Sequence, residues 1–293
     1  MPATLTLRAA IADYPHVRAL RDGSVCSERV AFEFVAISPI SRAFRPMAGE
    51  LAFDLSEMAV ATLAMARAKS VPIIGLSCVL MRGFHHAALV CPASSPLRGP
   101  ADLAGKRIGV RAWSQTTGVW LRGILADEQG LDPAACTWVT TEGAHVADCP
   151  DPPYVVRAPE GADLAAMLRA GEIDAGIALT GLDPAATRTV IPDAADAAAA
   201  WYRRRGIYPV NHALCLREDL IAAHPWLPGE LMRLFQAAKD AAPAPKAPAA
   251  LEGADPLPYG IAANRAAIET LMRYAAAQGL IPAAPRAEDL FAI

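Results

Sequence analysis

The chain has 293 residues, of which 54% are hydrophobic and 19% charged, and its formal net charge is −3. This length and apolar content suit one large domain or two lobes with a sizeable core, and they exclude a disordered or fibrous chain. The 27 basic and 30 acidic residues give no electrostatic reason to expect a nucleic-acid partner. The longest apolar run, from Met58 to Ala66, ends at Arg67 and is too short for a membrane helix, so no membrane partner is expected.

Segments typical of strands alternate with segments typical of helices. Strands are predicted at 5–9, 30–37, 73–80, 87–91, 105–111, 173–179 and 209–217. Helices are predicted at 58–69 with Ser56 as N-cap, at 114–129, 163–170 and 194–205, in two segments after 217, and near 264–279. This alternation predicts an α/β protein with mostly parallel sheets, and the Pro/Ala-rich stretch 241–250 is predicted to be a loop.

A weak internal repeat indicates two similar lobes. The stretch Ala48–Asp54 resembles Ala170–Asp174, and downstream of each lies a matched stretch that contains His86 in the first copy and His212 in the second. The repeat predicts that these two histidines occupy equivalent strand positions. Ligands often bind in the cleft between such lobes, so the repeat nominates both histidines as site residues.

The cysteines and the N-terminus bear on the cellular compartment. None of the 6 cysteines forms a Cys-x-x-Cys pair, and several lie in apolar runs, as expected for small buried thiols rather than a disulfide framework. The N-terminus lacks a basic start followed by an apolar stretch of signal-peptide length. We therefore expect a cytoplasmic protein.

A family resemblance rests on motifs that occur in a fixed order along nearly the whole chain. These motifs are Arg18–Gly23, Phe53–Met58, Arg82–His86, Asp102–Val110, Val119–Leu125, Ala170–Asp174, Tyr202–Pro209, His224–Trp226 and Pro258–Ile261 with Asn264 and Arg265. Together they resemble the 4,5-dihydroxyphthalate decarboxylase family. The resemblance implies the two-lobed fold of periplasmic solute-binding proteins, in which each lobe is a mostly parallel sheet flanked by helices and the ligand cleft lies between the lobes. We predict a first lobe at 1–92, a second at 93–206, and a return to the first at 207–293 with C-terminal helices.

The resemblance also implies an activity, the non-oxidative decarboxylation of a small hydroxylated aromatic dicarboxylate, most simply 4,5-dihydroxyphthalate to protocatechuate and carbon dioxide. No cofactor is expected, a divalent metal stays an alternative, and the oligomeric state is left open. Two other readings stay open: a non-catalytic solute-binding protein for a small organic anion, and another small-molecule enzyme on the same scaffold. The expected absence of a signal peptide favours the enzyme.

Decarboxylation of this kind needs an anion clamp, and two candidates are present. Arg82 interrupts an apolar run, and a guanidinium can bind a carboxylate through two parallel hydrogen bonds. Ser114, Gln115, Thr116 and Thr117 follow a predicted strand and open a helix, where hydroxyls and free N–H groups suit an anion.

The reaction also needs a proton donor. His86 and His212 are the predicted acid/base pair and His85 a predicted substrate contact, because an imidazole with a pKa of ~6.5 exchanges protons at neutral pH. The alternative is that these histidines bind a metal together with Glu57, although no His-x-His or His-x-x-x-His spacing supports it.

Further candidates could contact the aromatic ring and its hydroxyl groups. Glu57, expected in the first turn of the helix that begins near Ser56, is predicted to accept hydrogen bonds from the substrate hydroxyls or to act as their base. Asp13 and Tyr14 follow the first strand, where α/β sheets place ligand contacts. Tyr259 is predicted to stack on the ring.

Overall fold

The computed structural model describes residues 4–293, which divide into two units. The first unit consists of the chain up to Arg82, Val210–Glu269 and Pro285–Ile293, and the second of Gly83–Pro209 and Thr270–Ala284. The chain first passes from one unit to the other after Arg82, ten residues before the border predicted at 92/93. It returns after Pro209, three residues after the border predicted at 206/207. The first crossing comes earlier because the strand Leu89–Pro92 pairs within the sheet of the second unit. Segment 270–284 also belongs to the second unit, which the three-part prediction did not include.

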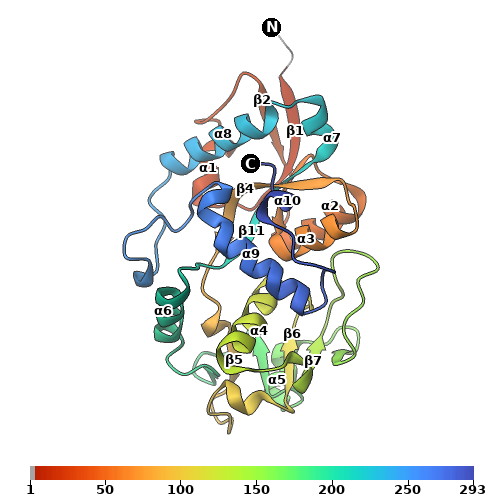
Figure 1. Ribbon diagram of the computed structural model, residues 1–293, viewed down its shortest axis with the longest axis vertical. Coiled ribbons are helices and arrows are strands. Elements are labelled where there is room, and N and C mark those ends of the chain that lie inside the picture. Colours follow the sequence, from red (N-terminus) through yellow and green to blue (C-terminus); the bar gives the residue numbers. More distant parts are fainter. Residues whose placement is uncertain (1–3) are drawn as a thin grey trace. The chain divides into compact units, whose positions relative to one another are not determined.

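The first unit is built on a five-stranded sheet with the order β2-β1-β3-β11-β4. Four of these strands, β1, β2, β4 and β11, are labelled in Figure 1. Strands β2, β1 and β3 are parallel, whereas β11 runs antiparallel to both of its neighbours. The strands are β1 (Leu5–Ala10), β2 (Val30–Phe34), β3 (Leu55–Ala59), β4 (Ile73–Arg82) and β11 (Val210–Arg217). The helices are α1 (Arg18–Arg21), α2 (Phe44–Glu50), α3 (Val60–Ala68), α7 (Glu218–Ala223), α8 (Leu227–Ala241) and α10 (Ala287–Leu290).

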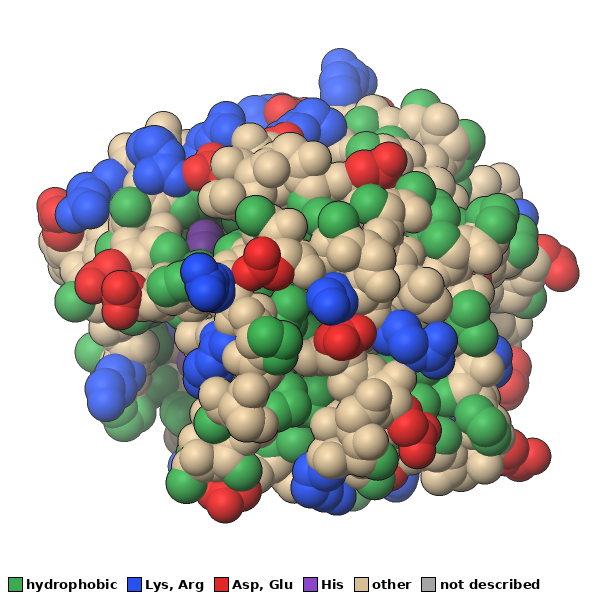
Figure 2. Space-filling model, turned by 90° about the horizontal axis from the view of Figure 1, so that it is seen from below, with side chains coloured by type: hydrophobic (Ala, Val, Ile, Leu, Met, Phe, Trp, Pro, Cys, Tyr) green, Lys and Arg blue, Asp and Glu red, His purple; other side chains and the backbone are tan. Residues whose placement is uncertain are grey.

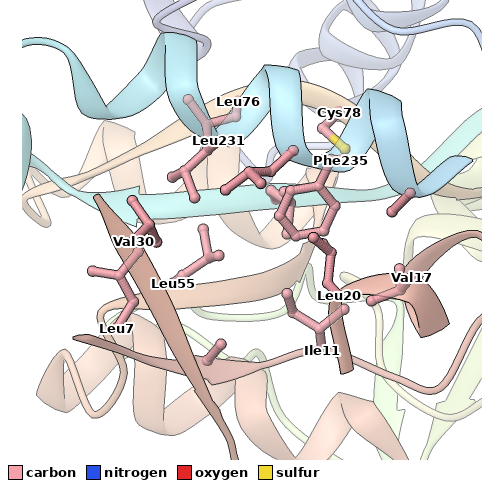
Figure 3. Packing of buried hydrophobic residues seen from close by; sticks show 14 of the residues in the cluster. Leu7, Ile11, Val17, Leu20, Val30, Leu55, Leu76, Cys78, Leu231 and Phe235 are labelled. Carbon is pink, nitrogen blue, oxygen red and sulfur yellow. The ribbon is translucent and has the colours of Figure 1, made fainter. Parts of the chain in front are cut away.

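The core of this unit lies between one face of the sheet and helix α8 (Figure 3). Leu7 and Ile11 of the β1 segment, Leu55 of β3 and Leu76 of β4 pack beneath Leu231 and Phe235 of α8, all of them buried. Every second residue of a strand points to the same face. Glu57 therefore lies on the face of β3 that also carries Leu55.

The second unit is built on a six-stranded sheet with the order β10-β5-β9-β6-β7-β8. Its strands are β5 (Leu89–Pro92), β6 (Arg107–Val110), β7 (Thr137–Thr140), β8 (Val155–Arg157), β9 (Ala175–Ile177) and β10 (Thr187–Thr189). Its helices are α4 (Thr116–Gln129), α5 (Leu164–Ala170) and α6 (Ala194–Arg205), and α9 (Ile261–Ala277) runs from the first unit into the second.

The two sheets share one topology, as the sequence repeat predicts. Strands β2-β1-β3-β11-β4 correspond in order and direction to β7-β6-β9-β5-β10, and β8 is added at one edge. The matched aspartates make the same contact: Asp54 accepts a hydrogen bond from the Arg8 N–H at 2.9 Å, and Asp174 accepts one from the Arg107 N–H at 2.8 Å. The repeated acidic residue thus joins the start of β3 to β1 and the start of β9 to β6.

One predicted element is wrong at its start. The helix expected from residue 58 begins only at Val60, and Ser56 and Glu57 lie within β3 rather than at a helix N-terminus. Every residue from Leu55 to Ala66 is buried, including the polar Ser56, Glu57 and Thr62, so no exposed face marks the period of a strand or of a helix. Pairing with β1 on one side and β11 on the other makes its first five residues a strand.

The charged surface is mixed. On the face seen in Figure 2, Lys and Arg side chains are interspersed with Asp and Glu. None of the helices within residues 4–293 is long and apolar enough to span a bilayer.

Candidate functional site

A buried carboxylate lies at the centre of the first sheet. Glu57 is fully buried in β3, between β1 and β11, and both of its carboxylate oxygens are hydrogen-bonded. Its Oε1 accepts a hydrogen bond from the Tyr14 hydroxyl at 2.7 Å and lies 2.6 Å from Nδ1 of His212. Its Oε2 accepts the backbone N–H of Ala12 at 3.1 Å. An uncompensated buried carboxylate would be costly, and these three contacts offset that cost.

The contact with Glu57 fixes the tautomer and the orientation of the His212 imidazole. With an ionised Glu57 as acceptor, Nδ1 is the protonated nitrogen, and Nε2 is left to interact with a reacting group. Nε2 forms no hydrogen bond to the residues in the described part of the chain, and the His212 side chain keeps 14% of its surface exposed. The edge of Phe44 packs against the imidazole, with ring centroids 5.1 Å apart and an interplanar angle of 86°. The ring is therefore held from two sides.

Tyr14 completes this group, which we call the Glu57 cluster: Ala12, Tyr14, Glu57 and His212. Burial, and after it the negative charge of Glu57, raises the pKa of the Tyr14 hydroxyl well above its usual value. Tyr14 therefore stays protonated at neutral pH and acts as a donor to Glu57. Its ring stacks on His16 with centroids 5.1 Å apart, and burial lowers the pKa of that histidine.

The other predicted residues of the first unit lie in different surroundings. Arg82 ends β4, and its Nη1 donates to Oδ1 of Asn264 at 3.0 Å. Asn264 in turn donates to the carbonyl oxygens of Pro258 at 2.7 Å and Gly260 at 3.0 Å, so this amide fixes the Arg82 head group.

Asp13 is exposed and pairs with Arg18 at 3.3 Å. Tyr259 is partly buried against the core of the first unit, with the Lys239 ammonium 4.8 Å from its ring centroid. Burial raises the pKa of Tyr259 far above its usual value.

The second unit holds the other two predicted histidines. His86 lies in the 3-10 helix η3 (His86–Ala88), and His85 precedes it. The register corrects the predicted equivalence of His86 and His212. Because Asp54 matches Asp174, Glu57 of β3 matches Ile177 of β9. Leu214 lies opposite Glu57 and Leu89 lies opposite Ile177, so Leu214 matches Leu89. Two residues earlier, His212 therefore matches Ala87 and not His86. The sequence alignment of the two copies was displaced by one residue.

His85 and His86 are both largely buried. His85 stacks on Trp120 at a centroid distance of 6.5 Å. His86 lines a pocket of about 200 Å³ whose walls come mainly from α4 and α6. Burial lowers the pKa of His86 to about 4, which makes this imidazole neutral at physiological pH.

The predicted Ser/Thr turn does open a helix. Helix α4 begins at Thr116 and follows β6 in the chain, and Gln115 is its N-cap residue. The hydroxyls of Ser114 and Thr116 are buried, and neither makes a hydrogen bond to another residue within positions 4–293. Buried hydroxyls without partners beside the N-terminus of a 14-residue helix are suited to an anion.

Sequence reasoning did not identify every residue that matters here. The Ala12 N–H and the amide of Asn264 were not predicted, because a backbone donor and a distant amide leave no local pattern.

Residues 4–293 contain no group of three or more His, Cys, Asp or Glu side chains arranged to hold a metal.

Comparison with known proteins identifies the family. The chain is 32% identical over 251 residues to the 4,5-dihydroxyphthalate decarboxylase of Comamonas testosteroni, which covers 80% of this chain and 75% of that protein. The chain belongs to the 4,5-dihydroxyphthalate decarboxylase family. The corresponding protein of Pseudomonas putida is 31% identical over 186 residues, which are 59% of this chain and 70% of that family member. No family model matches the chain. The resemblance predicted from the sequence is therefore confirmed.

The solved structures confirm the predicted fold. The periplasmic aliphatic sulphonate binding protein SsuA of Escherichia coli superposes with a TM-score of 0.59, covering 99% of this chain and 92% of SsuA. The sequence identity is 12%, so the similarity concerns the fold alone. This decarboxylase-family chain thus has the architecture of a periplasmic solute-binding protein.

Proposed function

We propose that the chain is a carboxy-lyase that converts 4,5-dihydroxyphthalate to protocatechuate and carbon dioxide. The observation that carries this proposal is the 2.6 Å contact between Glu57 and Nδ1 of His212 in a chain of this family. A buried carboxylate that orients an imidazole and compensates its charge is an arrangement for proton transfer, which a solute-binding protein does not need.

His212 is the proton donor in this proposal. In its imidazolium form, with a proton on each ring nitrogen, His212 transfers the Nε2 proton to the ring carbon that bears the departing carboxylate, and the hydroxyl group para to that carbon supplies electron density. The carbon–carbon bond then breaks, its electron pair restores the aromatic ring, and carbon dioxide leaves. The imidazole ends neutral and regains a proton from water. Protonating the carbon first avoids an aryl carbanion, so the step as written needs no electron sink from a cofactor.

Glu57 takes a different role from the one predicted. Its oxygens are buried and occupied by Tyr14, Ala12 and His212, so direct contact with substrate hydroxyls is disfavoured. We assign it the positioning of His212 and the compensation of the imidazolium charge. Tyr14 donates to the same Oε1 that contacts His212, and the Ala12 N–H binds Oε2.

His86 is not assigned a proton transfer, since an imidazole with a pKa of about 4 carries little proton at neutral pH. Arg82, fixed by Asn264, remains the candidate carboxylate contact of the first unit, and the first turn of α4 with Ser114 and Thr116 that of the second.

A second candidate function is binding without catalysis. It is favoured by the SsuA-like fold, and a turnover assay separates it from the decarboxylase.

The test measures protocatechuate and carbon dioxide from 4,5-dihydroxyphthalate with purified protein, with and without EDTA. We expect turnover in both arms. His212→Asn keeps a donor toward Glu57 but has no group at the Nε2 position, and it should lower kcat ~10²–10⁴-fold, the range typical of general acid catalysis. His224→Asn, a substitution of a partly exposed histidine that packs on Trp226, is the matched control and should leave kcat unchanged.

Each outcome decides between the candidates. Turnover lost with EDTA and restored by a divalent ion would recast the histidines as metal ligands. Binding of the dicarboxylate without turnover would support the solute-binding protein. Equal turnover in the His212→Asn variant and the wild type would refute the assignment of the proton donor.

A further inference from the structure

Helix α4 contains an arginine that is buried without an acidic partner. Arg122 is 1% exposed, and its guanidinium lies over the ring of Trp113, 3.6 Å from the centroid. Its Nε donates to Oε1 of Gln278 at 2.7 Å, and its Nη2 donates to the carbonyl oxygen of Trp113. Both acceptors are neutral.

The guanidinium of Arg122 therefore makes no direct contact with any carboxylate that the structure describes, and the negative charge of Asp151 acts on it only from farther away. Burial lowers the pKa of Arg122 to about 9, which still leaves the group charged at neutral pH. Across residues 4–293, no carboxylate lies within 4.0 Å of this guanidinium, and Asp151 pairs instead with Arg157 at 3.0 Å. A buried charge is costly unless it is paired, and a cation near a helix N-terminus also opposes the helix dipole. The rings of Trp113 and Trp138, with centroids 3.6 and 5.1 Å from the guanidinium, stabilise the cation, but they leave its Nη1 without a hydrogen bond to residues 4–293.

The guanidinium lies beside the first turn of the helix. A Cβ atom added to Gly118 would come 2.8 Å from Nη1 of Arg122, so the glycine provides the room for this group. Nη1 is buried and makes no hydrogen bond to the part of the chain that the structure describes. The buried hydroxyls of Ser114 and Thr116, at the start of the same helix, are likewise without partners there. Hydroxyls, the helix N-terminus and a fixed positive charge thus occur together.

We infer that Arg122 is the charged element of an anion subsite at the first turn of α4, and that this subsite selects a carboxylate of an aromatic dicarboxylate over neutral groups. Arg122 acts as a positioning and specificity residue: its bond to the Trp113 carbonyl holds the turn that carries Ser114, and its charge favours an anion at that turn. The inference rests on the proposed function only for the chemical class of the ligand.

The network around Gln278 supports the positioning role. The side-chain amide of Gln278 donates to the carbonyl oxygen of Val119 at 2.8 Å, and the backbone carbonyl oxygen of Gln278 accepts the indole N–H of Trp113 at 3.2 Å. Trp113, Val119 and Arg122 are thereby all hydrogen-bonded to one buried residue, Gln278, which gives the subsite a fixed shape.

The test measures the Kd of phthalate and of benzoate by titration calorimetry on the full chain. Arg122→Met removes the charge but keeps an apolar stem of similar length, and Arg122→Lys keeps the charge. We expect the Met variant to bind phthalate about tenfold more weakly and to lose preference for phthalate over benzoate, and the Lys variant to recover part of both. Arg203→Met, the same substitution at an exposed residue of α6, is the control and should change neither Kd.

Gly118→Ala provides a second variant if Arg122→Met does not fold. Its methyl group would displace the guanidinium without removing the charge, and phthalate binding should weaken about threefold. The inference is overturned if a folded Met variant keeps the phthalate Kd and the preference, if Arg203→Met weakens binding as much, or if the wild type does not bind phthalate. If phthalate binding depends on Arg122 but the protein does not turn over 4,5-dihydroxyphthalate, the decarboxylase is refuted and the anion subsite stands.

Discussion

Replacement of Glu57 by glutamine is the sharpest perturbation of the Glu57 cluster, because it changes the charge and leaves the size almost unchanged. Oε1 serves both Tyr14 and His212, at 2.7 and 2.6 Å, and Oε2 serves the Ala12 N–H at 3.1 Å. Glutamine offers only one oxygen for these three contacts. With that oxygen at the Oε1 position, its NH2 group faces the Ala12 N–H, and an unpaired buried donor costs about 1–3 kcal/mol. With the amide reversed, the NH2 group faces His212, whose Nδ1 must then accept, and the proton moves to Nε2.

Either orientation removes the negative charge that compensates a protonated His212. We expect the Glu57→Gln variant to lose ~10²–10⁴-fold in kcat, with a smaller change in KM, because a charge that acts mainly in the transition state is lost. Initial rates at neutral pH measure both constants, and urea unfolding measures the stability cost. Glu33→Gln, at an exposed position of β2, is the control and should retain activity and stability.

Tyr14→Phe removes one donor and leaves the charge, so we expect a smaller loss in kcat of about 10–30-fold. This corresponds to about 1.5–2 kcal/mol, within the range for a hydrogen bond to a charged group. A folded Glu57→Gln variant with at least half of the wild-type kcat would refute the reasoning.

Two further predictions concern the second unit. The pKa of His86 is about 4 in the folded protein and ~6.5 in the unfolded chain, which therefore binds more protons between these values. The free energy of unfolding should therefore fall as the pH is lowered from about 6.5 to 4. Urea unfolding of the wild type and of His86→Gln at pH 7.0, 5.5 and 4.5 measures this, and between the first and last pH the wild type should lose about 1–3 kcal/mol more than the variant. Parallel pH dependence of the two proteins would contradict the prediction. Gly123→Ala would place a Cβ atom 2.2 Å from ring atoms of Tyr274 and should lower the stability by about 1–3 kcal/mol or more, whereas Gly49→Ala, in a helix with nothing within 4 Å, should raise it slightly. Melting temperatures measure both substitutions, and equal shifts would show that the Gly123 backbone is not held against that ring.

Local signals in the sequence are sufficient for most of the secondary structure. The helix predicted at 194–205 is α6 with both ends correct, and α5 begins after Asp163, whose carboxylate caps the helix at the Ala166 N–H. Such signals act between residues a few positions apart, so they are readable without the fold. The repeat that contains Asp54 and Asp174 also predicted that the two sheets are alike, because each aspartate bonds to the neighbouring strand of its own sheet.

The site depended on contacts that are far apart in the chain. Glu57 is 43 residues from Tyr14 and 155 from His212, and Arg122 is 156 residues from Gln278. The residue types could be nominated from the sequence, but their grouping follows from strand order and register, where a shift of one residue moves a side chain to the other face.

The amino-acid sequence by itself therefore determined the family, the two-sheet α/β architecture and the set of candidate residues, since these rest on motifs, periodicity and local contacts. Only the tertiary structure decided that Glu57 is a buried strand residue bound to His212, and that Ala87 rather than His86 matches His212 in the repeat. The physical reason is that burial and hydrogen-bond partners are set by strands that pair across the fold, and a linear pattern does not encode that pairing.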